Sequence, residues 1–168
     1  MGNVLLSADV FSQSDPEILS LHDGEIKISF PGDWQRVSLS VDGEDILEKG
    51  ALFSRNNPWA TFEISIVYLG NDPVYDTAEY KKEFLNNTKS KVIKELKSQN
   101  CKWLFAVDKQ FFGEEGLMIT YGDEVMQREV YVVKNYRLYS LSFGCEKEYF
   151  DTQWYIIESL IKRSEPLP

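Results

Sequence analysis

Two segments in the first half of the chain alternate between apolar and polar residues, which is the pattern of a β-strand with one buried face. Residues 25–30 place every second side chain on an apolar face. Residues 61–69 do so over a longer stretch that includes Phe62, Ile64 and Ile66. Both segments are therefore predicted strands of a sheet that buries one of its faces.

Two other segments carry apolar residues at the three- and four-residue spacing of an amphipathic helix. The first helix is predicted over residues 76–98 and begins with a capping-box pattern formed by Asp76 and Glu79. The second is predicted over residues 147–162. The core-facing stripes are Tyr80, Phe84, Leu85, Thr88, Val92 and Leu96 in the first helix and Phe150, Trp154, Ile157 and Ile161 in the second.

Short strands separated by turn residues fill the rest of the chain. A turn at Lys134 and Asn135 is expected to join the last two strands, and Gly144 is expected to end the sheet. The order of strands and helices predicts an α+β fold, a twisted antiparallel sheet packed with two main amphipathic helices as an α/β/α sandwich. Residues 1–22 are expected to form an N-terminal arm and residues 23–165 a single domain. The additional strands are predicted over 51–54, 103–107, 110–112, 116–121, 127–133 and 136–143.

Charge is distributed unevenly along the 168 residues. The whole chain has 18 basic and 27 acidic residues and a net charge of −9. Residues 1–84 contain 15 acids and 6 bases, so they carry the entire excess, 6 − 15 = −9. An acidic protein repels the phosphate backbone, so we expect no nucleic-acid partner. The excess is either a solvated surface that keeps the protein in solution or a docking face for a basic partner.

The sequence offers little material for catalysis or for a metal centre. It has one histidine, His22, and two cysteines, Cys101 and Cys145, which lack metal-ligand spacing. Phosphate-binding glycine motifs are absent. The acidic loop at residues 42–48 does not match a calcium-binding loop. We expect no catalytic residue, no metal and no cofactor.

Specific residues give the chain a family resemblance. Ile26, Ile28, Phe30, Pro31 and Trp34 resemble the opening strand of the PsbP-like superfamily, with its proline and tryptophan. The tyrosine-rich strand followed by the final helix resembles the end of the same domain, so the resemblance spans about residues 22–163. It implies a PsbP-like fold shared with Mog-type proteins and bacterial lipoproteins, whose members are mostly non-catalytic binding or assembly modules.

The leading functional hypothesis is a non-catalytic binding or accessory module that recognises a protein partner. The module would use an acidic surface that bears aromatic residues, and the partner would have a basic surface. We expect an exported or lipid-anchored bacterial protein whose signal or anchor is not in this chain, with a cytoplasmic location left open; any membrane association would depend on that removed anchor. The alternatives are a small-molecule or carbohydrate-binding domain, with a pocket between sheet and helix, and a carboxylate-dependent hydrolase. The candidate partner-binding residues are Asp42, Glu44, Asp45, Glu48 and Trp59.

Overall fold

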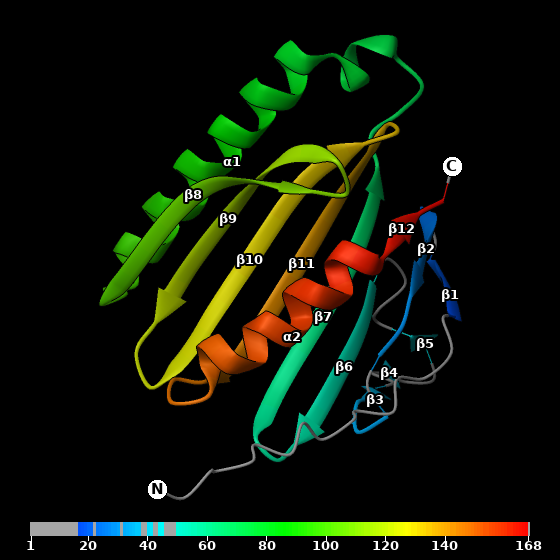
Figure 1. Ribbon diagram of the computed structural model, residues 1–168. Coiled ribbons are helices and arrows are strands. Elements are labelled where there is room, and N and C mark those ends of the chain that lie inside the picture. Colours follow the sequence, from blue (N-terminus) through cyan, green and yellow to red (C-terminus); the bar gives the residue numbers. More distant parts are fainter. Residues whose placement is uncertain are drawn as a thin grey trace, which may run out of the picture.

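The computed structural model describes residues 17–21, 23–30, 32–37, 40–41, 44–45 and 50–167. In this part of the chain three layers are stacked, with one helix on each face of a large central sheet (Figure 1). A small sheet lies beside the second helix (Figure 1). No helix of the described part is both long enough and apolar enough to cross a membrane.

The central sheet has seven strands, all paired in antiparallel fashion, in the order β3-β6-β7-β11-β10-β9-β8. Three hairpins, β6–β7, β8–β9 and β10–β11, supply most of it, and the pairing of β7 with β11 joins the first hairpin to the last. The strands are β3 (Gln35–Val37), β6 (Gly50–Asn56), β7 (Trp59–Tyr68), β8 (Trp103–Phe111), β9 (Glu114–Gly122), β10 (Val125–Lys134) and β11 (Arg137–Glu146).

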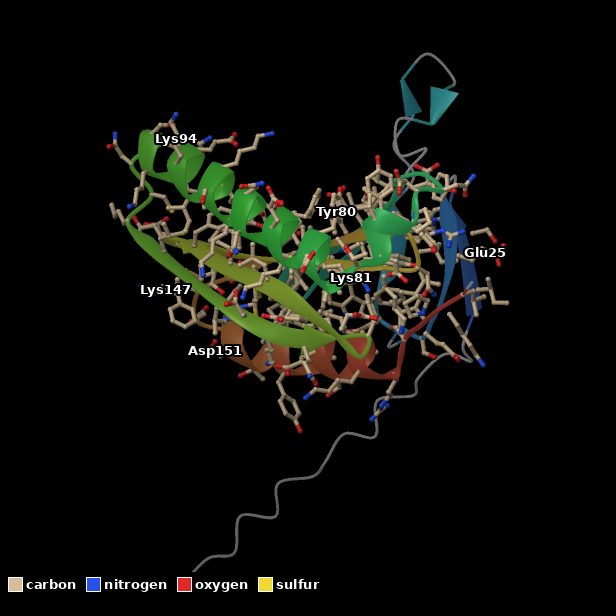
Figure 2. All side chains as sticks on the ribbon, turned by 90° about the horizontal axis from the view of Figure 1, so that it is seen from above. Glu25, Tyr80, Lys81, Lys94, Lys147 and Asp151 are labelled. Atoms are coloured by element: carbon tan, nitrogen blue, oxygen red, sulfur yellow. The ribbon has the colours of Figure 1, made fainter. Side chains whose placement is uncertain are left out.

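Two smaller sheets complete the strands. β2 (Gly24–Ile28) pairs with both β1 (Glu17–Leu21) and β12 (Glu165–Pro166), so the two ends of the described chain meet in one sheet. β4 (Ser40–Val41) and β5 (Glu44–Asp45) form a separate two-stranded hairpin. The hairpin projects on the same side of the central sheet as the first helix (Figure 2).

The helices are η1 (Pro73–Asp76), a single 3-10 turn, α1 (Ala78–Ser98) and α2 (Phe150–Arg163). The predicted capping box at the start of α1 is wrong. Thr77 is the N-cap, and its hydroxyl accepts from the Tyr80 amide, because Asp76 is still part of η1.

The hydrophobic core is divided between the two faces of the central sheet. The larger cluster lies under α2 and the small sheet and includes the fully buried Phe62, Tyr139 and Phe143. The smaller lies under α1, around Leu85 and Leu96. Burying each large apolar side chain contributes about 2 kcal/mol. The predicted α+β fold is therefore confirmed, with two helices on opposite faces of one antiparallel sheet.

Several predicted element boundaries are wrong in detail. The strands predicted over 103–107 and 110–112 are one continuous strand, β8 (Trp103–Phe111), and Phe112 and Gly113 form the turn to β9. The β10–β11 turn consists of Asn135 and Tyr136, one residue later than predicted. Gly144 does not end the sheet, because β11 continues to Glu146.

Candidate binding surface

The charged side chains of the seven-stranded sheet are divided unequally between its two faces. Side chains alternate between the faces along each strand, so the register assigns each of them to one side. By register, five of the acids, Glu63, Asp108, Glu115, Glu129 and Glu146, lie on the α1 side and Glu114 lies on the α2 side. The basic side chains of these seven strands all lie on the α2 side. Those basic residues are Arg36, Arg55, Lys109, Arg128, Lys134 and Arg137.

The helix on the α1 side covers only half of the sheet. α1 contacts β8, β9 and β10, and its Lys89 lies 3.8 Å from the Asp108 carboxylate of β8. The α1 side of β6, β7 and β11, which we call the acidic face, has no helix over it among the described residues. Its half-exposed side chains are Leu52 and Ser54 of β6, Thr61, Glu63, Ser65 and Val67 of β7, and Leu138, Ser140 and Ser142 of β11.

Trp59 stands at one end of this acidic face. It begins β7 opposite Asn56, and its side chain is 38% exposed. By alternation it shares a side of the sheet with Glu63, about 13 Å further along the strand at about 3.3 Å per residue. An exposed tryptophan and a carboxylate are thus presented on the same strand face.

The hairpin that carries Trp59 is anchored by the buried Arg55. The guanidinium donates to Oε1 of Gln153 in α2 at 3.0 Å and to the Asn57 carbonyl oxygen at 2.6 Å. Its Nη2 lies 2.8 Å from a carboxylate oxygen of Asp33. These bonds join the end of β6, just before the turn to Trp59, to α2 and to Asp33 ahead of β3.

At the boundary between the acidic face and α1, Glu129 is held by two tyrosines. The hydroxyl of Tyr121 donates to Glu129 Oε1 at 2.7 Å, and that of Tyr131 donates to Oε2 at 2.5 Å. Burial, followed by the bond to this carboxylate, raises the pKa of each tyrosine. Both hydroxyls therefore stay protonated, and Glu129 acts as their acceptor beside a cavity of about 190 Å³.

Several groups of the kind used in catalysis are buried or paired in the described part of the chain. Cys145 is buried, and burial raises the pKa of its thiol to about 11, so it is a poor nucleophile. Glu114 pairs with Lys81 at 3.2 Å, and Asp123 pairs with Lys102. Within the described ranges no three His, Cys, Asp or Glu side chains cluster in a way that could hold a metal ion.

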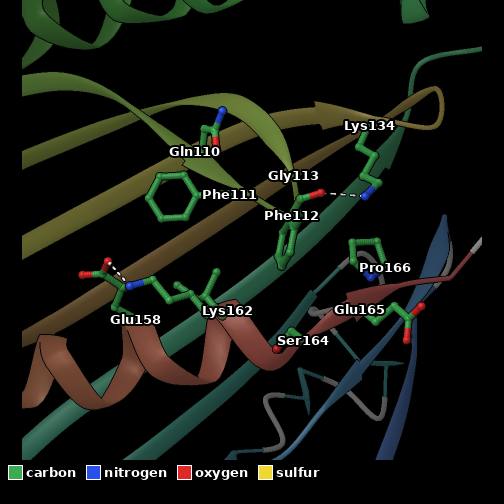
Figure 3. Close-up of a pocket in the computed structure, with 11 residues that line it drawn as sticks. Gln110, Phe111, Phe112, Gly113, Lys134, Glu158, Lys162, Ser164, Glu165 and Pro166 are labelled. Atoms are coloured by element: carbon green, nitrogen blue, oxygen red, sulfur yellow. Dashed lines mark hydrogen bonds and ion pairs between the residues drawn. The ribbon is translucent and has the colours of Figure 1, made fainter.

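Two cavities lie on the other face, one at each end of α2. The cavity at its C-terminal end measures about 330 Å³ and reaches the β8–β9 turn (Figure 3). There the Lys134 ammonium donates to the Phe112 carbonyl at 2.6 Å, and Glu158 accepts from Lys162 at 3.1 Å. The cavity at the N-terminal end measures about 270 Å³ and is lined by Arg128.

Among the described residues, the structure does not bring together the partner-binding residues predicted from the sequence. Asp42 and Glu48 lie outside the described residues. Glu44 and Asp45 form β5, in the hairpin between β3 and the Gly50 end of β6, whereas Trp59 lies at the opposite end of the β6–β7 hairpin.

The sequence search for sites missed Glu63 and Arg128. Glu63 sits on the polar face of a strand that the alternation pattern does predict. Arg128 lies inside a predicted strand, on the same face of that strand as Val130 and Val132.

No family model matches the chain, and no curated protein is similar to it in sequence. Among solved structures, cyanobacterial PsbP (CyanoP) from Synechocystis sp. PCC 6803 superposes with a TM-score of 0.58 at 14% identity, covering 96% of this chain and 96% of that one. A point mutant of protein Mog1 gives a TM-score of 0.51 at 8% identity, covering 90% of this chain and 96% of that one. LpqN of Mycobacterium tuberculosis gives 0.47 at 10% identity, with 94% and 92% covered.

The superpositions on CyanoP and Mog1 define the class of the protein as an α+β sandwich with helices on both faces of an antiparallel sheet. The chain has the PsbP/Mog1-like fold, as the residue pattern of its opening strand and final helix predicted. At these identities the likeness establishes the fold alone.

Proposed function

We propose that this protein is a non-catalytic binding protein that recognises a protein partner with a basic surface through the acidic face. The observation that supports this most directly is the exposed Trp59 on an anchored hairpin, on the same strand face as Glu63. The strands contribute acids and no described basic side chain to that side of the sheet. Binding modules are also the common use of the PsbP-like fold, as the resemblance implies.

The two residues have different roles in this proposal. A tryptophan offers a large, rigid contact area, and such residues often carry most of an interface's binding energy. A carboxylate at the rim contributes chiefly to the rate of association and to specificity, through long-range attraction that salt screens. Glu44 and Asp45 of β5 remain predicted partner contacts.

Site-specific photo-crosslinking in the source cells tests the proposal. A benzophenone amino acid at Ser65 on the acidic face should capture one defined protein, whereas the same group at Tyr155, which is 73% exposed on α2, should not. Equal capture of the same protein at both positions would count against the acidic face.

Binding to the purified partner then separates the two contributions. Trp59→Ala should weaken binding by about 30-fold, the loss typical of a central aromatic contact. Glu63→Lys should slow association several-fold at low salt, an effect that fades at about 0.5 M salt. Glu83→Lys, the same charge change on the exposed side of α1, is the matched control. If Glu63→Lys and Glu83→Lys behave alike, the proposed role of the acidic face is wrong.

Export or membrane tethering remains a separate prediction. It is tested by the location of the full-length protein in fractionated source cells and by the N-terminal residue of the mature form.

A further inference from the structure

Arg128 places a positive charge in the apolar layer between the sheet and α2. Its side chain is only 12% exposed. The carbon at the centre of its guanidinium lies 4.7 Å from the ring centroid of Phe150 and 4.7 Å from that of Trp154. Its Nε donates to Thr120 Oγ1 at 2.7 Å. Stacking on two rings and one hydrogen bond fix the plane of the guanidinium.

The protein leaves the terminal nitrogens of this guanidinium without a close acceptor. Among the described residues, the nearest carboxylate oxygen belongs to Asp151, 3.9 Å from Nη2, which exceeds hydrogen-bonding distance. That carboxyl group is 95% exposed, so water screens its attraction. Burial lowers the pKa of Arg128 more than Asp151 and Glu158 raise it, so the charge is incompletely compensated.

Arg128 lines a cavity whose other lining residues suit an anion with an apolar body. The cavity, of about 270 Å³, is lined by Met126, Arg128, Lys147, Phe150 and Asp151. Lys147 is exposed, and its charge also acts on Asp123, whose pKa it helps to lower. Two cations against one carboxylate leave the lining with a net charge of +1.

We infer that this cavity is a binding site for a small carboxylate with an apolar or aromatic body, and that Arg128 receives its carboxylate group. The planar guanidinium matches two carboxylate oxygens in a bidentate pair. Phe150 and Met126 contact the apolar body, and Lys147 adds a second positive charge at the mouth.

A monoanion fits this lining better than a phosphate does. The net charge of +1 balances one negative charge, and part of the lining is apolar. The site lies on the α2 side of the sheet, so it is independent of the acidic face and of the partner proposed for it.

Titration with benzoate, followed by two-dimensional amide and arginine-side-chain NMR, tests this inference. We expect saturable shifts at the Arg128 Nε–H, Thr120, Lys147 and Phe150, with a Kd on the order of 1 mM. Benzamide, which keeps the ring but lacks the charge, should produce shifts at least tenfold weaker, and so should inorganic phosphate. Benzamide shifts of equal size would make the cavity a purely apolar site, and tighter phosphate binding would overturn the carboxylate assignment.

Charge variants at the rim keep the test valid even if Arg128 is needed for folding. Lys147→Gln should weaken benzoate binding about threefold and Asp151→Asn should tighten it about twofold, since both groups are exposed. Lys82→Gln, the same charge change on α1, should leave the affinity unchanged. Arg128→Lys retains the charge but loses the planar pair of N–H donors that binds both carboxylate oxygens. A folded variant should therefore bind benzoate at least tenfold more weakly. If Lys147→Gln and Lys82→Gln have equal effects, or if benzoate fails to saturate any of these signals at about 20 mM, the inference is wrong.

Discussion

One ion pair joins Glu158 of α2 to Lys109 of the edge strand β8, and its energy can be measured. Glu158 Oε1 accepts from Lys109 Nζ of β8 at 2.6 Å and lies 3.1 Å from Lys162 Nζ, one turn later in the same helix. Lys109 therefore connects two layers of the fold, whereas Lys162 connects neighbouring turns of one helix.

The exposures of the three side chains predict unequal coupling energies. Glu158 is 16% exposed, Lys109 37% and Lys162 71%. A half-buried, charged hydrogen bond contributes more than a solvated helix pair, although screening at Lys109 reduces it. We expect about 1 kcal/mol of coupling between Lys109 and Glu158, and about 0.3 kcal/mol between Lys162 and Glu158.

The pH dependence of this pair has a defined sign. Burial raises the pKa of Glu158, but the hydrogen bonds and charges of Lys109 and Lys162 lower it by more, so the net pKa lies below its ordinary value. A carboxyl group with a lowered pKa stabilises the fold above the unfolded-state pKa of about 4.3, and that contribution is lost as the pH falls through the folded-state pKa. Glu158→Gln should therefore cost more stability at pH 7 than at pH 3.

Urea unfolding followed by tryptophan fluorescence measures these energies. Two double-mutant cycles are needed, one from Lys109→Met and Glu158→Gln and the other from Lys162→Met and Glu158→Gln. Equal coupling in the two cycles would refute the argument from burial. A Glu158→Gln cost that stays constant between pH 7 and pH 3 would refute the argument from the lowered pKa.

Three further predictions concern single side chains. Arg55→Met should lower the free energy of unfolding by about 3 kcal/mol, because it leaves the buried Gln153 carbonyl without its donor; a loss below 1 kcal/mol in the same urea assay would contradict this. Tyr136→Gly should raise stability by about 0.5 kcal/mol, since Asn135 and Tyr136 both have positive φ, at 51° and 61°, and glycine adopts that conformation without strain; a lower urea midpoint would contradict it. The Cys145 thiol, with its pKa raised to about 11 by burial, should not react with a disulfide reagent at pH 8 until the protein is unfolded, and rapid native labelling at that residue, located by mass spectrometry, would show that it is accessible.

The elements that were predictable from the sequence are those in which buried residues repeat at the regular spacing of a helix or of a strand. In α2, Phe150, Trp154, Ile157 and Ile161 repeat at helical spacing, and the structure buries all four. β7 was predictable for the same reason, at a period of two. In both cases a single face packs against the larger core, so local pattern and tertiary environment agree.

Errors occurred where tertiary partners override the local pattern. Asp108 and Lys109 interrupt the apolar pattern of β8, yet the strand continues because Lys89 and Glu158 pair with them from the two helices. The β10–β11 turn was misplaced by one residue, since nothing in the local sequence shows that Tyr136 adopts a positive φ.

The candidate site could be anticipated only in part for a related reason. Alternation along β7 places Glu63 on a polar face, but its neighbours on that face come from β11, about 80 residues later in the chain. Similarly, the parity of β10 directs Arg128 toward the core. The rings that make this burial tolerable belong to α2, which follows in the next part of the chain. Contacts between distant segments therefore create both proposed sites.

The two proposals use opposite faces of one sheet, and this separation follows from the pairing of the strands. In a strand, neighbouring side chains point to opposite sides of the sheet. When acids and bases occupy alternate positions along the strands, the acids therefore gather on one side and the bases on the other. Among the side chains of the central strands, all arginines and lysines lie on the α2 side, which suits anions, and most of the acids lie on the α1 side, which suits a basic partner. Accordingly, Glu63→Lys should leave benzoate binding at Arg128 unchanged, and Lys147→Gln should leave partner binding unchanged. Cross-effects between the two would mean that the net charge of −9, rather than its division between the faces, governs recognition.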